Sequence, residues 1–173
     1  DESRLLVPEG MTARAYAADI MRTQLSAVTG KDYSEAGDAE FTDSLMYNVA
    51  PAMSFWGGFY QNTIYRFRPN GLDPESSIMD IVILRPVPKD GPRPQPVPTM
   101  HLDFDEPVTL AGETMGEGLA VVFEQDAINL PWVQKGLRAS RTGTVEFTNY
   151  QEQRLRLHHR LIDRLIAEGE AAQ

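Results

Sequence analysis

The segment Val121–Leu137 (VVFEQDAINLPWVQKGL) places two polar side chains where an apolar helix face is expected. If the segment is helical, one stripe has the spacing of a core-facing surface. Its members are Val122, Asp126, Asn129, Leu130, Val133 and Leu137. A buried carboxylate is costly unless it is paired, hydrogen-bonded or bound to a metal. Two interpretations stay open: Asp126 faces inward and serves a site, or the helix is rotated by one position and Asp126 lies at the solvent edge.

Two other groups of residues have side chains that bind metals in proteins. His101, Asp103, Asp105 and Glu106 lie close together in an acidic, loop-rich stretch. One histidine beside flexible acids is usually part of a solvated loop, and we favour that interpretation. The pair His158-His159 cannot face one site from adjacent helical positions. We therefore expect packing or surface roles for both histidines.

Composition indicates a single soluble domain over residues 1–173, with 42% hydrophobic and 24% charged residues. The net charge of −9 argues against a nucleic-acid partner, because phosphate binding needs a basic face. No apolar run reaches the roughly 20 residues of a membrane helix, no signal peptide opens the chain, and we expect a cytoplasmic protein. The absence of cysteine excludes disulfides and cysteine-ligated iron–sulfur clusters within this chain. The opening Asp1-Glu2-Ser3-Arg4 suggests a fragment of a longer polypeptide.

Three helices are predicted. The first covers roughly Ala13–Val28, with Thr12 as its N-cap and Gly30 at its end. The second begins near Gly118 and contains Pro131, which removes a backbone hydrogen bond and bends the axis. The third runs from Tyr150 to about Glu168 behind a capping box formed by Asn149 and Glu152.

The β-prone segments lie between the first two helices. Pro51 and Gly57-Gly58 divide residues 47–65 into two strands, and a hairpin is predicted from about Ile64 to Leu84. Residues 40–47 fit a short helix or the start of a strand, and Thr144–Thr148 fits a short strand. Pro86–Pro98 holds six prolines and is predicted to be an ordered surface connection rather than a ligand for a signalling domain. These elements predict an α+β fold with helices packed on one face of a sheet.

Several motifs follow one another in an order typical of one enzyme family. They are Tyr65–Gly71 (YRFRPNG) with Asp73-Pro74, Leu84–Pro88 (LRPVP) with Gly91–Pro94 (GPRP), Phe123–Asp126 (FEQD), Asn129–Pro131 (NLP), Val133-Gln134, Gly136-Leu137 and Asn149–Glu152 (NYQE). Between about Leu6 and Leu165 the chain resembles the C-terminal part of the catalytic domain of Rieske non-haem iron, ring-hydroxylating oxygenases, alpha subunit.

The resemblance implies a helix-grip (Bet v1/START-like) fold, in which an antiparallel sheet packs against a long C-terminal helix. It also implies that Asp126 is a ligand to a mononuclear Fe(II), as the carboxylate of a 2-His-1-carboxylate triad. Glu124 is the fallback ligand, although its side chain points about 200° around a helix from that of Asp126. Asn129, one turn on, would orient the carboxylate or a bound water.

The chain also departs from the family pattern. The family's two histidine ligands lie on a helix upstream of this chain, and no H-x₄-H spacing occurs in it. The segment that holds the Rieske 2Fe-2S cluster is absent as well. Many relatives carry a Pro-Asn pair where this chain has Ala50-Pro51-Ala52-Met53. The resemblance therefore implies a fold incomplete at its N-terminus, and a fragment that is inactive alone.

The leading hypothesis is the catalytic portion of an oxygenase that hydroxylates an aromatic or related apolar substrate with O₂, by mono- or dioxygenation. Electrons would come from NAD(P)H through a reductase or a ferredoxin, and relatives assemble as trimers or hetero-oligomers. The expected substrate-pocket wall consists of Phe55, Trp56, Phe59 and Tyr60. The alternative is a non-catalytic helix-grip module that binds an apolar small molecule without metal. A weaker hypothesis makes Pro86–Pro98 a partner-binding segment.

Overall fold

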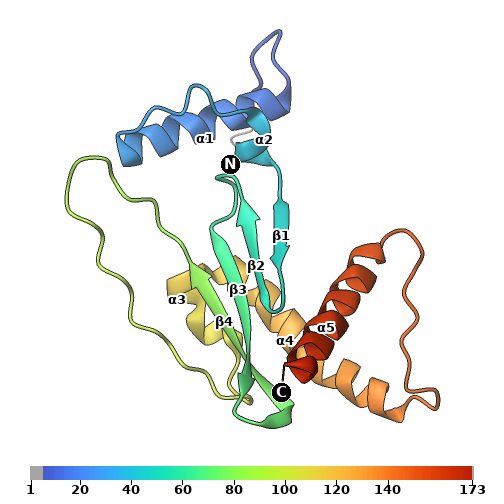
Figure 1. Ribbon diagram of the computed structural model, residues 1–173. Helices are drawn as coiled ribbons and strands as arrows, with labels where there is room; N and C mark the ends of the chain where they lie inside the picture. Colours follow the sequence, from blue (N-terminus) through green and yellow to red (C-terminus); the bar gives the residue numbers. More distant parts are fainter. Residues whose placement is uncertain (1–5, 173) are drawn as a thin grey trace. The chain divides into compact units, whose positions relative to one another are not determined.

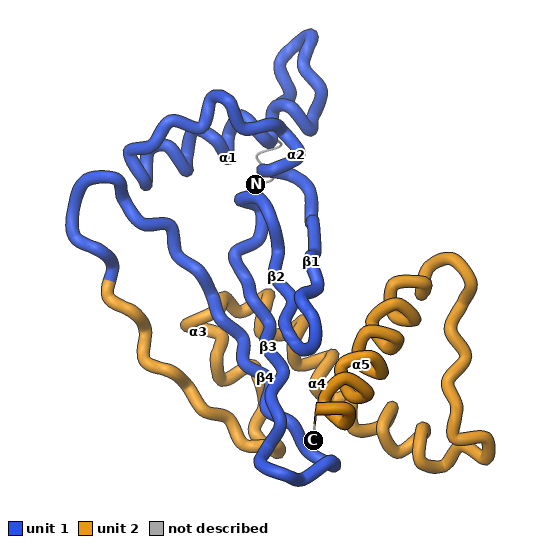
Figure 2. The backbone as a smooth tube through the Cα atoms, viewed as in Figure 1, with its two compact units in different colours: residues 1–94 blue, residues 95–173 orange. Residues whose placement is uncertain are grey.

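The chain forms two compact units, and the computed structural model describes residues 6–172. Unit 1 spans Asp1–Pro94 and unit 2 spans Gln95–Gln173 (Figure 2). Unit 1 contains an antiparallel sheet with two helices, and unit 2 is helical, so the predicted α+β class is confirmed (Figure 1). The prediction of one domain over residues 1–173 concerns how these units assemble, and it stays a prediction.

Local signals place the first helix of unit 1, α1 (Ala13–Thr29). The hydroxyl of Thr12 accepts a hydrogen bond from the backbone N–H of Ala15 at 3.1 Å, which satisfies one of the free donors at the helix start. Gly30 ends the helix in the left-handed conformation, with φ at 68°, and its N–H donates to the carbonyl of Ser26. The predicted helix is confirmed to within one residue.

The stretch 40–47, which fitted either a helix or a strand, contains the end of one and the start of the other. A short helix, α2 (Asp38–Thr42), precedes β1 (Leu45–Val49). At the start of α2, the carboxylate of Glu40 accepts a hydrogen bond from the N–H of Gly37 at 2.9 Å.

The sheet has four antiparallel strands in the order β1-β2-β3-β4. Its remaining strands are β2 (Met53–Gly57), β3 (Thr63–Asn70) and β4 (Asp73–Ile83). The predicted hairpin is the β3–β4 pair, whose tight turn places Gly71 at a φ of 63°, a conformation that suits glycine. Pro51 lies between β1 and β2, and Gly57 ends β2, as their residue types predicted.

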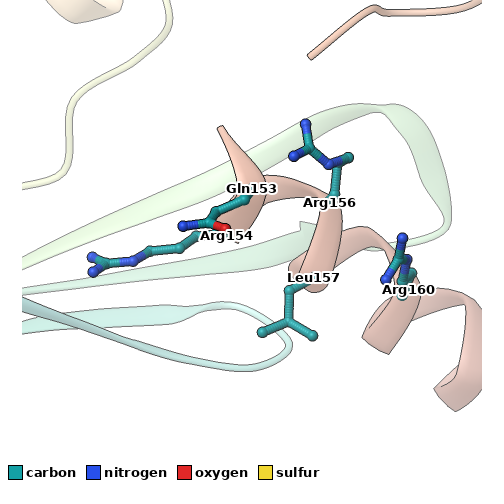
Figure 3. A pocket seen from close by; sticks show the side chains of 5 residues that line it. All are labelled: Gln153, Arg154, Arg156, Leu157 and Arg160. Atoms are coloured by element: carbon teal, nitrogen blue, oxygen red, sulfur yellow. The ribbon is translucent and has the colours of Figure 1, made fainter. Parts of the chain in front are cut away.

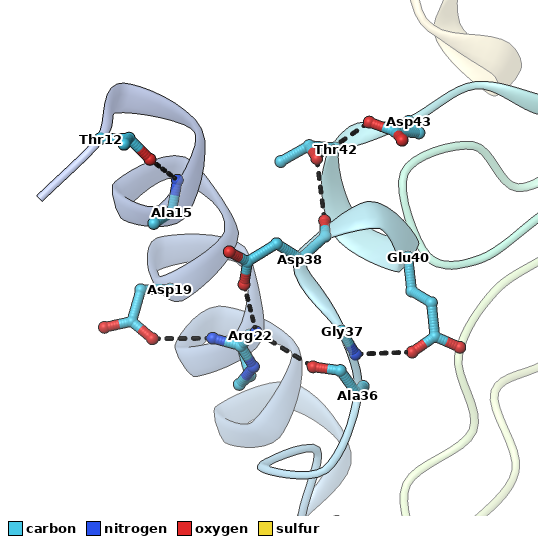
Figure 4. Close-up of polar contacts among 10 residues, drawn as sticks. All are labelled: Thr12, Ala15, Asp19, Arg22, Ala36, Gly37, Asp38, Glu40, Thr42 and Asp43. Atoms are coloured by element: carbon cyan, nitrogen blue, oxygen red, sulfur yellow. Dashed lines mark hydrogen bonds and ion pairs between the residues drawn. The ribbon is translucent and has the colours of Figure 1, made fainter.

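Phe41, which is fully buried, is the centre of the small core of unit 1. The rings of Tyr33 and Phe59 pack against it, and the guanidinium of Arg22 lies 5.0 Å from its centroid. Arg22 also donates to Asp19, to Asp38 and to the carbonyl of Ala36 (Figure 4). Arg22 thus ties α1 to the segment that leads into α2.

Unit 2 contains a 3₁₀ turn and three helices: η1 (Val108–Ala111), α3 (Gly112–Met115), α4 (Glu117–Ala139) and α5 (Gln153–Ala171). Its buried apolar residues are Ala120 and Phe123 on α4, the helix that packs against η1 and α3. Pro131 lies inside α4, as predicted.

Two predictions for unit 2 are wrong. Thr144–Thr148 forms no strand, and the guanidinium of Arg156 binds the backbone carbonyls of residues 147, 148 and 149. The capping box before α5 is absent, because the carboxylate of Glu152 accepts from the N–H of Thr148. As a result, α5 begins at Gln153, three residues later than predicted.

Candidate functional site

Asp126 lies on α4 with its side chain exposed. The apolar stripe predicted to face the core is exposed with it: Val122 keeps 53% and Leu130 keeps 56% of its surface accessible. The buried residues Ala120 and Phe123 lie about 120° and 60° around the helix from Asp126. The prediction that this stripe faces the core is therefore wrong. The alternative, a rotated helix with Asp126 in solvent, matches the structure.

The two carboxylates of this segment have different surroundings. Glu124 is half-buried and accepts a hydrogen bond from the backbone N–H of Thr109 at 3.2 Å, which holds α4 to η1. Asp126 has no hydrogen-bond or ion-pair partner among residues 6–172. Asn129, one turn further along, is exposed and likewise has no partner among the described residues. Of the two acids, Asp126 is the one whose oxygens are available to a ligand.

Among the other candidate ligands, Glu106, His158 and His159 make local side-chain contacts. In the acidic loop, the carboxylate of Glu106 accepts from the N–H of Asp103 at 2.8 Å, which is a turn contact. His159 packs on Phe147 with ring centroids 5.4 Å apart, and the ring of His158 stands edge-on to it. Within residues 6–172, no three His, Asp or Glu side chains gather into a metal-binding group. The described residues thus supply no full set of ligands for a mononuclear iron at Asp126.

The four residues expected to line one substrate pocket point in different directions. Phe55 and Trp56 are adjacent in β2, so their side chains project from opposite faces of the sheet. Phe55 stacks on Tyr47 at 5.3 Å, whereas the indole N–H of Trp56 donates to the hydroxyl of Tyr65 at 3.1 Å.

The other two pocket candidates follow β2. Phe59 stacks on Phe41 with ring centroids 5.0 Å apart, and Tyr60 is exposed. The structure therefore does not bring Phe55, Trp56, Phe59 and Tyr60 together as one wall.

The two faces of the sheet differ in chemistry. The face that bears Trp56 is mainly apolar and includes Met46, Tyr65, Phe67, Met79 and Ile81. The opposite face also carries apolar side chains, among them Tyr47, Phe55 and Ile64. It differs in holding Arg66 and Arg68, whose guanidinium groups converge on Asp80 at 2.7–3.0 Å. Hydrogen bonds from Arg68 and then Arg66 hold the pKa of the Asp80 carboxyl well below its usual value.

The Arg66–Arg68–Asp80 cluster was missed in the sequence, although its signal was present. Arg66 and Arg68 are two residues apart in a predicted strand and so share a face. The register Arg66↔Asp80 was needed to show which acid lies opposite. The sequence analysis used these arginines only as part of the family motif. In the structure they bind Asp80 and so join the two strands of the hairpin.

Each unit contains a shallow hollow. In unit 1 a hollow of about 230 Å³ is lined by Met21, Gln24, Leu25, Val28, Phe59 and Pro86. In unit 2 a hollow of about 390 Å³ lies beside the first turns of α5 and is lined by Gln153, Arg154, Arg156, Leu157 and Arg160 (Figure 3). Asp126 lines neither hollow.

Comparison with protein families, with curated proteins and with solved structures finds no match for this chain. Along residues 6–172, none of the helices combines the length and the apolar character that crossing a membrane requires.

Proposed function

We propose that this chain is the C-terminal, substrate- and iron-binding portion of a Rieske-type ring-hydroxylating oxygenase. The order of the motifs from Tyr65–Gly71 to Asn149–Glu152 supports this family assignment. The observation that carries the site is the contrast on α4: Glu124 is bound to η1, while Asp126 presents a free carboxylate beside exposed apolar side chains.

In the proposed enzyme Asp126 supplies one oxygen ligand to Fe(II), and two histidines from an upstream helix supply the others. When bound, the metal would supply O₂ activation for hydroxylation of an aromatic or related apolar substrate. Asn129 follows Asp126 by one helical turn, so its amide would orient the carboxylate by hydrogen bonding. A ferredoxin or reductase would deliver electrons from NAD(P)H through the Rieske cluster of the full-length, oligomeric enzyme.

The helix-grip arrangement is part of the same proposal. The apolar sheet face that bears Trp56 and the apolar stripe of α5 are the surfaces that such a fold would cover. The chain exposes 14123 Å² of accessible surface. Two separate compact proteins with the lengths of unit 1 and unit 2 would together expose about 10,000 Å² of accessible surface. This excess supports a contact with further protein that covers the apolar faces.

The test is Asp126→Asn in the full-length enzyme, with iron measured per active site after purification. Asparagine keeps the shape of the side chain but removes the anionic oxygen ligand, so we expect iron retention to be lost. Glu124→Gln is the matched control. This variant should keep its iron, because the carboxylate of Glu124 accepts a hydrogen bond from the backbone of η1. Normal iron content in the Asp126→Asn enzyme would refute the assignment.

A non-catalytic helix-grip module for an apolar ligand is the second candidate. It is favoured by the histidine content, since the chain has three histidines and no H-x₄-H pair. The coding sequence upstream of Asp1 discriminates between the two proposals. A Rieske motif together with H-x₄-H there supports the oxygenase, and their absence supports the module.

A further inference from the structure

The turn between β3 and β4 contains the dipeptide Asn70-Gly71 (Figure 1). Strand β3 ends at Asn70, which pairs with Asp73, and Gly71 and Leu72 form the two-residue loop between them. All of these residues are exposed, and Leu72 is fully exposed. Water therefore reaches both the side-chain amide of Asn70 and the backbone of Gly71.

An asparagine that precedes a glycine undergoes a reaction that is slow at other asparagines. The backbone nitrogen of the glycine loses its proton and attacks Cγ of the asparagine, ammonia leaves, and a succinimide ring closes. Water then opens the ring at either carbonyl carbon, which gives aspartate or isoaspartate. Glycine favours the attack because it has no Cβ to keep the nitrogen from the side chain. The reaction consumes one water and releases one ammonia, and it needs no oxidant or reductant.

Both reacting groups are accessible in the structure. The N–H of Gly71 donates no hydrogen bond within residues 6–172. Gly71 has a φ of 63°, and a Cβ built on it would have no atom within 4 Å, so the space beside it is open. The amide of Asn70 donates to Oγ of Ser76 at 3.1 Å. This hydrogen bond is exposed, so water replaces it at small cost in free energy.

The backbone at this end of the hairpin is weakly held. Ring closure requires Asn70 to leave the extended conformation of β3. The register of the hairpin is irregular between Pro69 and Asn70, and Pro69 has no N–H to donate to the sheet. The pair formed by Asn70 and Asp73 is therefore the last pair of the ladder and lies beyond a proline. Such terminal pairs open at low cost in free energy.

The other four of the five asparagines lack this combination. They are Asn48, Asn62, Asn129 and Asn149, and they precede Val49, Thr63, Leu130 and Tyr150. Each of these following residues has a side chain that crowds its backbone nitrogen. The amide of Asn62 also donates to the carbonyl of Leu84 at 2.7 Å. Asn129 lies inside α4, where the next N–H belongs to the hydrogen bonds of the helix.

We propose that Asn70 is a site of spontaneous modification, converted through Gly71 to aspartate and isoaspartate in the folded chain. The product has a carboxylate opposite Asp73, where like charges repel each other. It also lacks the amide that donates to Ser76. In isoaspartate the main chain runs through the former side chain and gains one carbon, so the pair with Asp73 loses its register. The modification thus loosens the tip of the β3–β4 hairpin.

The test incubates the 173-residue chain in buffer at neutral pH and follows each asparagine by mass spectrometry after tryptic digestion. Because trypsin leaves Arg-Pro bonds intact, the peptide Phe67–Lys89 stays whole; it contains one asparagine and no glutamine. The mass gained when an amide becomes an acid is then assigned to Asn70. We expect Asn70 to convert at least about tenfold faster than the other asparagines, and chromatography to separate an aspartyl and an isoaspartyl product.

Asn70→Gln is the matched control, because glutamine keeps an amide but has to close a larger ring. The peptide from this variant should gain no mass in the same time. Aspartate without isoaspartate at Asn70 would overturn the route through Gly71, since direct hydrolysis of the amide gives aspartate alone. Conversion at Asn70 in denaturing urea but not in buffer would overturn the claim that the folded chain is modified.

The effect on the hairpin is tested with Asn70→Asp, which has the aspartyl product from the start. In a Trp132→Phe background, which leaves Trp56 of unit 1 as the fluorescent group, Asn70→Asp should lower the urea midpoint more than Asn70→Gln does. Equal midpoints would overturn the proposed loosening by the carboxylate. These measurements involve no iron, so their outcome is independent of the oxygenase assignment.

Discussion

Replacing Arg22 by methionine should destabilise unit 1 by about 2.5 kcal/mol. Its guanidinium donates to Asp38 at 3.0 Å and to the carbonyl of Ala36 at 3.1 Å, in part-buried surroundings. Two hydrogen bonds from a charged donor contribute about 1.5 kcal/mol each at the low end. The contact with the ring of Phe41 adds about 0.5 kcal/mol. The buried Nε of Arg22 lacks a partner among the described residues, and removing it recovers about 1 kcal/mol.

Urea denaturation followed by the fluorescence of Trp56 measures this loss, because Trp56 belongs to unit 1. The background substitution Trp132→Phe removes the second tryptophan, which belongs to unit 2. Methionine keeps the apolar stem of Arg22, so the change reports the guanidinium rather than a cavity.

Arg14→Met is the matched control. Arg14 also forms an ion pair of 2.8 Å, with Asp43, but these side chains are 55% and 37% exposed. Such a surface pair contributes less than about 1 kcal/mol. If Arg22→Met and Arg14→Met lower the free energy of unfolding by the same amount, the Arg22 network does not join α1 to α2. A double-mutant cycle with Asp38→Ala should give a coupling energy above about 0.5 kcal/mol.

Two further predictions concern the hairpin and the glycine beside α2. The lowered pKa of Asp80 means that its contribution to stability is complete above the unfolded pKa of about 3.9 and is lost as pH falls below it. Between about pH 5 and about pH 3, Asp80→Asn should therefore reduce the loss of urea resistance; an unchanged slope would contradict the role of the Arg68–Asp80 contact. Gly58→Ala should cost about 3 kcal/mol, because Gly58 has a φ of 76° and an added Cβ would lie 2.5 Å from the carbonyl oxygen of Glu40. Gly10→Ala, at a φ of 81° with open space around it, should cost about 1 kcal/mol, and similar losses at both sites would show that the clash is absent.

Elements with local signals were predictable from the sequence. Helix α1 has its start and stop signals in the residues that flank it, Thr12 and Gly30, and both act as predicted. The β3–β4 hairpin has Gly71 at its turn, an alternating pattern in Thr63–Phe67 and a mostly apolar run from Ile78 to Leu84. Neither element needs a distant residue to define where it ends.

Predictions that depended on distant partners failed. Thr144–Thr148 alternates like a strand, but Arg156 takes the carbonyls of Phe147 and Thr148 that a neighbouring strand would have used. Helix α4 was predicted in the right place with the wrong face buried. Phe123, which stands between Val122 and Glu124 in the sequence, is buried on the helix that packs against η1 and α3, two elements whose position the sequence did not indicate.

The exposed position of Asp126 limits what this helix can do unaided. A free carboxylate in water binds a divalent cation weakly, because its hydration is lost on binding and no second ligand shares the charge. The apolar residues around Asp126, among them Val122 and Leu130, are costly to leave in water, so a protein surface that covers them would also dry the carboxylate. Drying strengthens the attraction between the carboxylate and a metal, provided that the covering surface brings further ligands. The proposed site therefore predicts that the isolated chain retains no stoichiometric Fe(II) after desalting. Tight iron in the isolated chain that survives Asp126→Asn would place the metal elsewhere and remove the reason for assigning Asp126 to it.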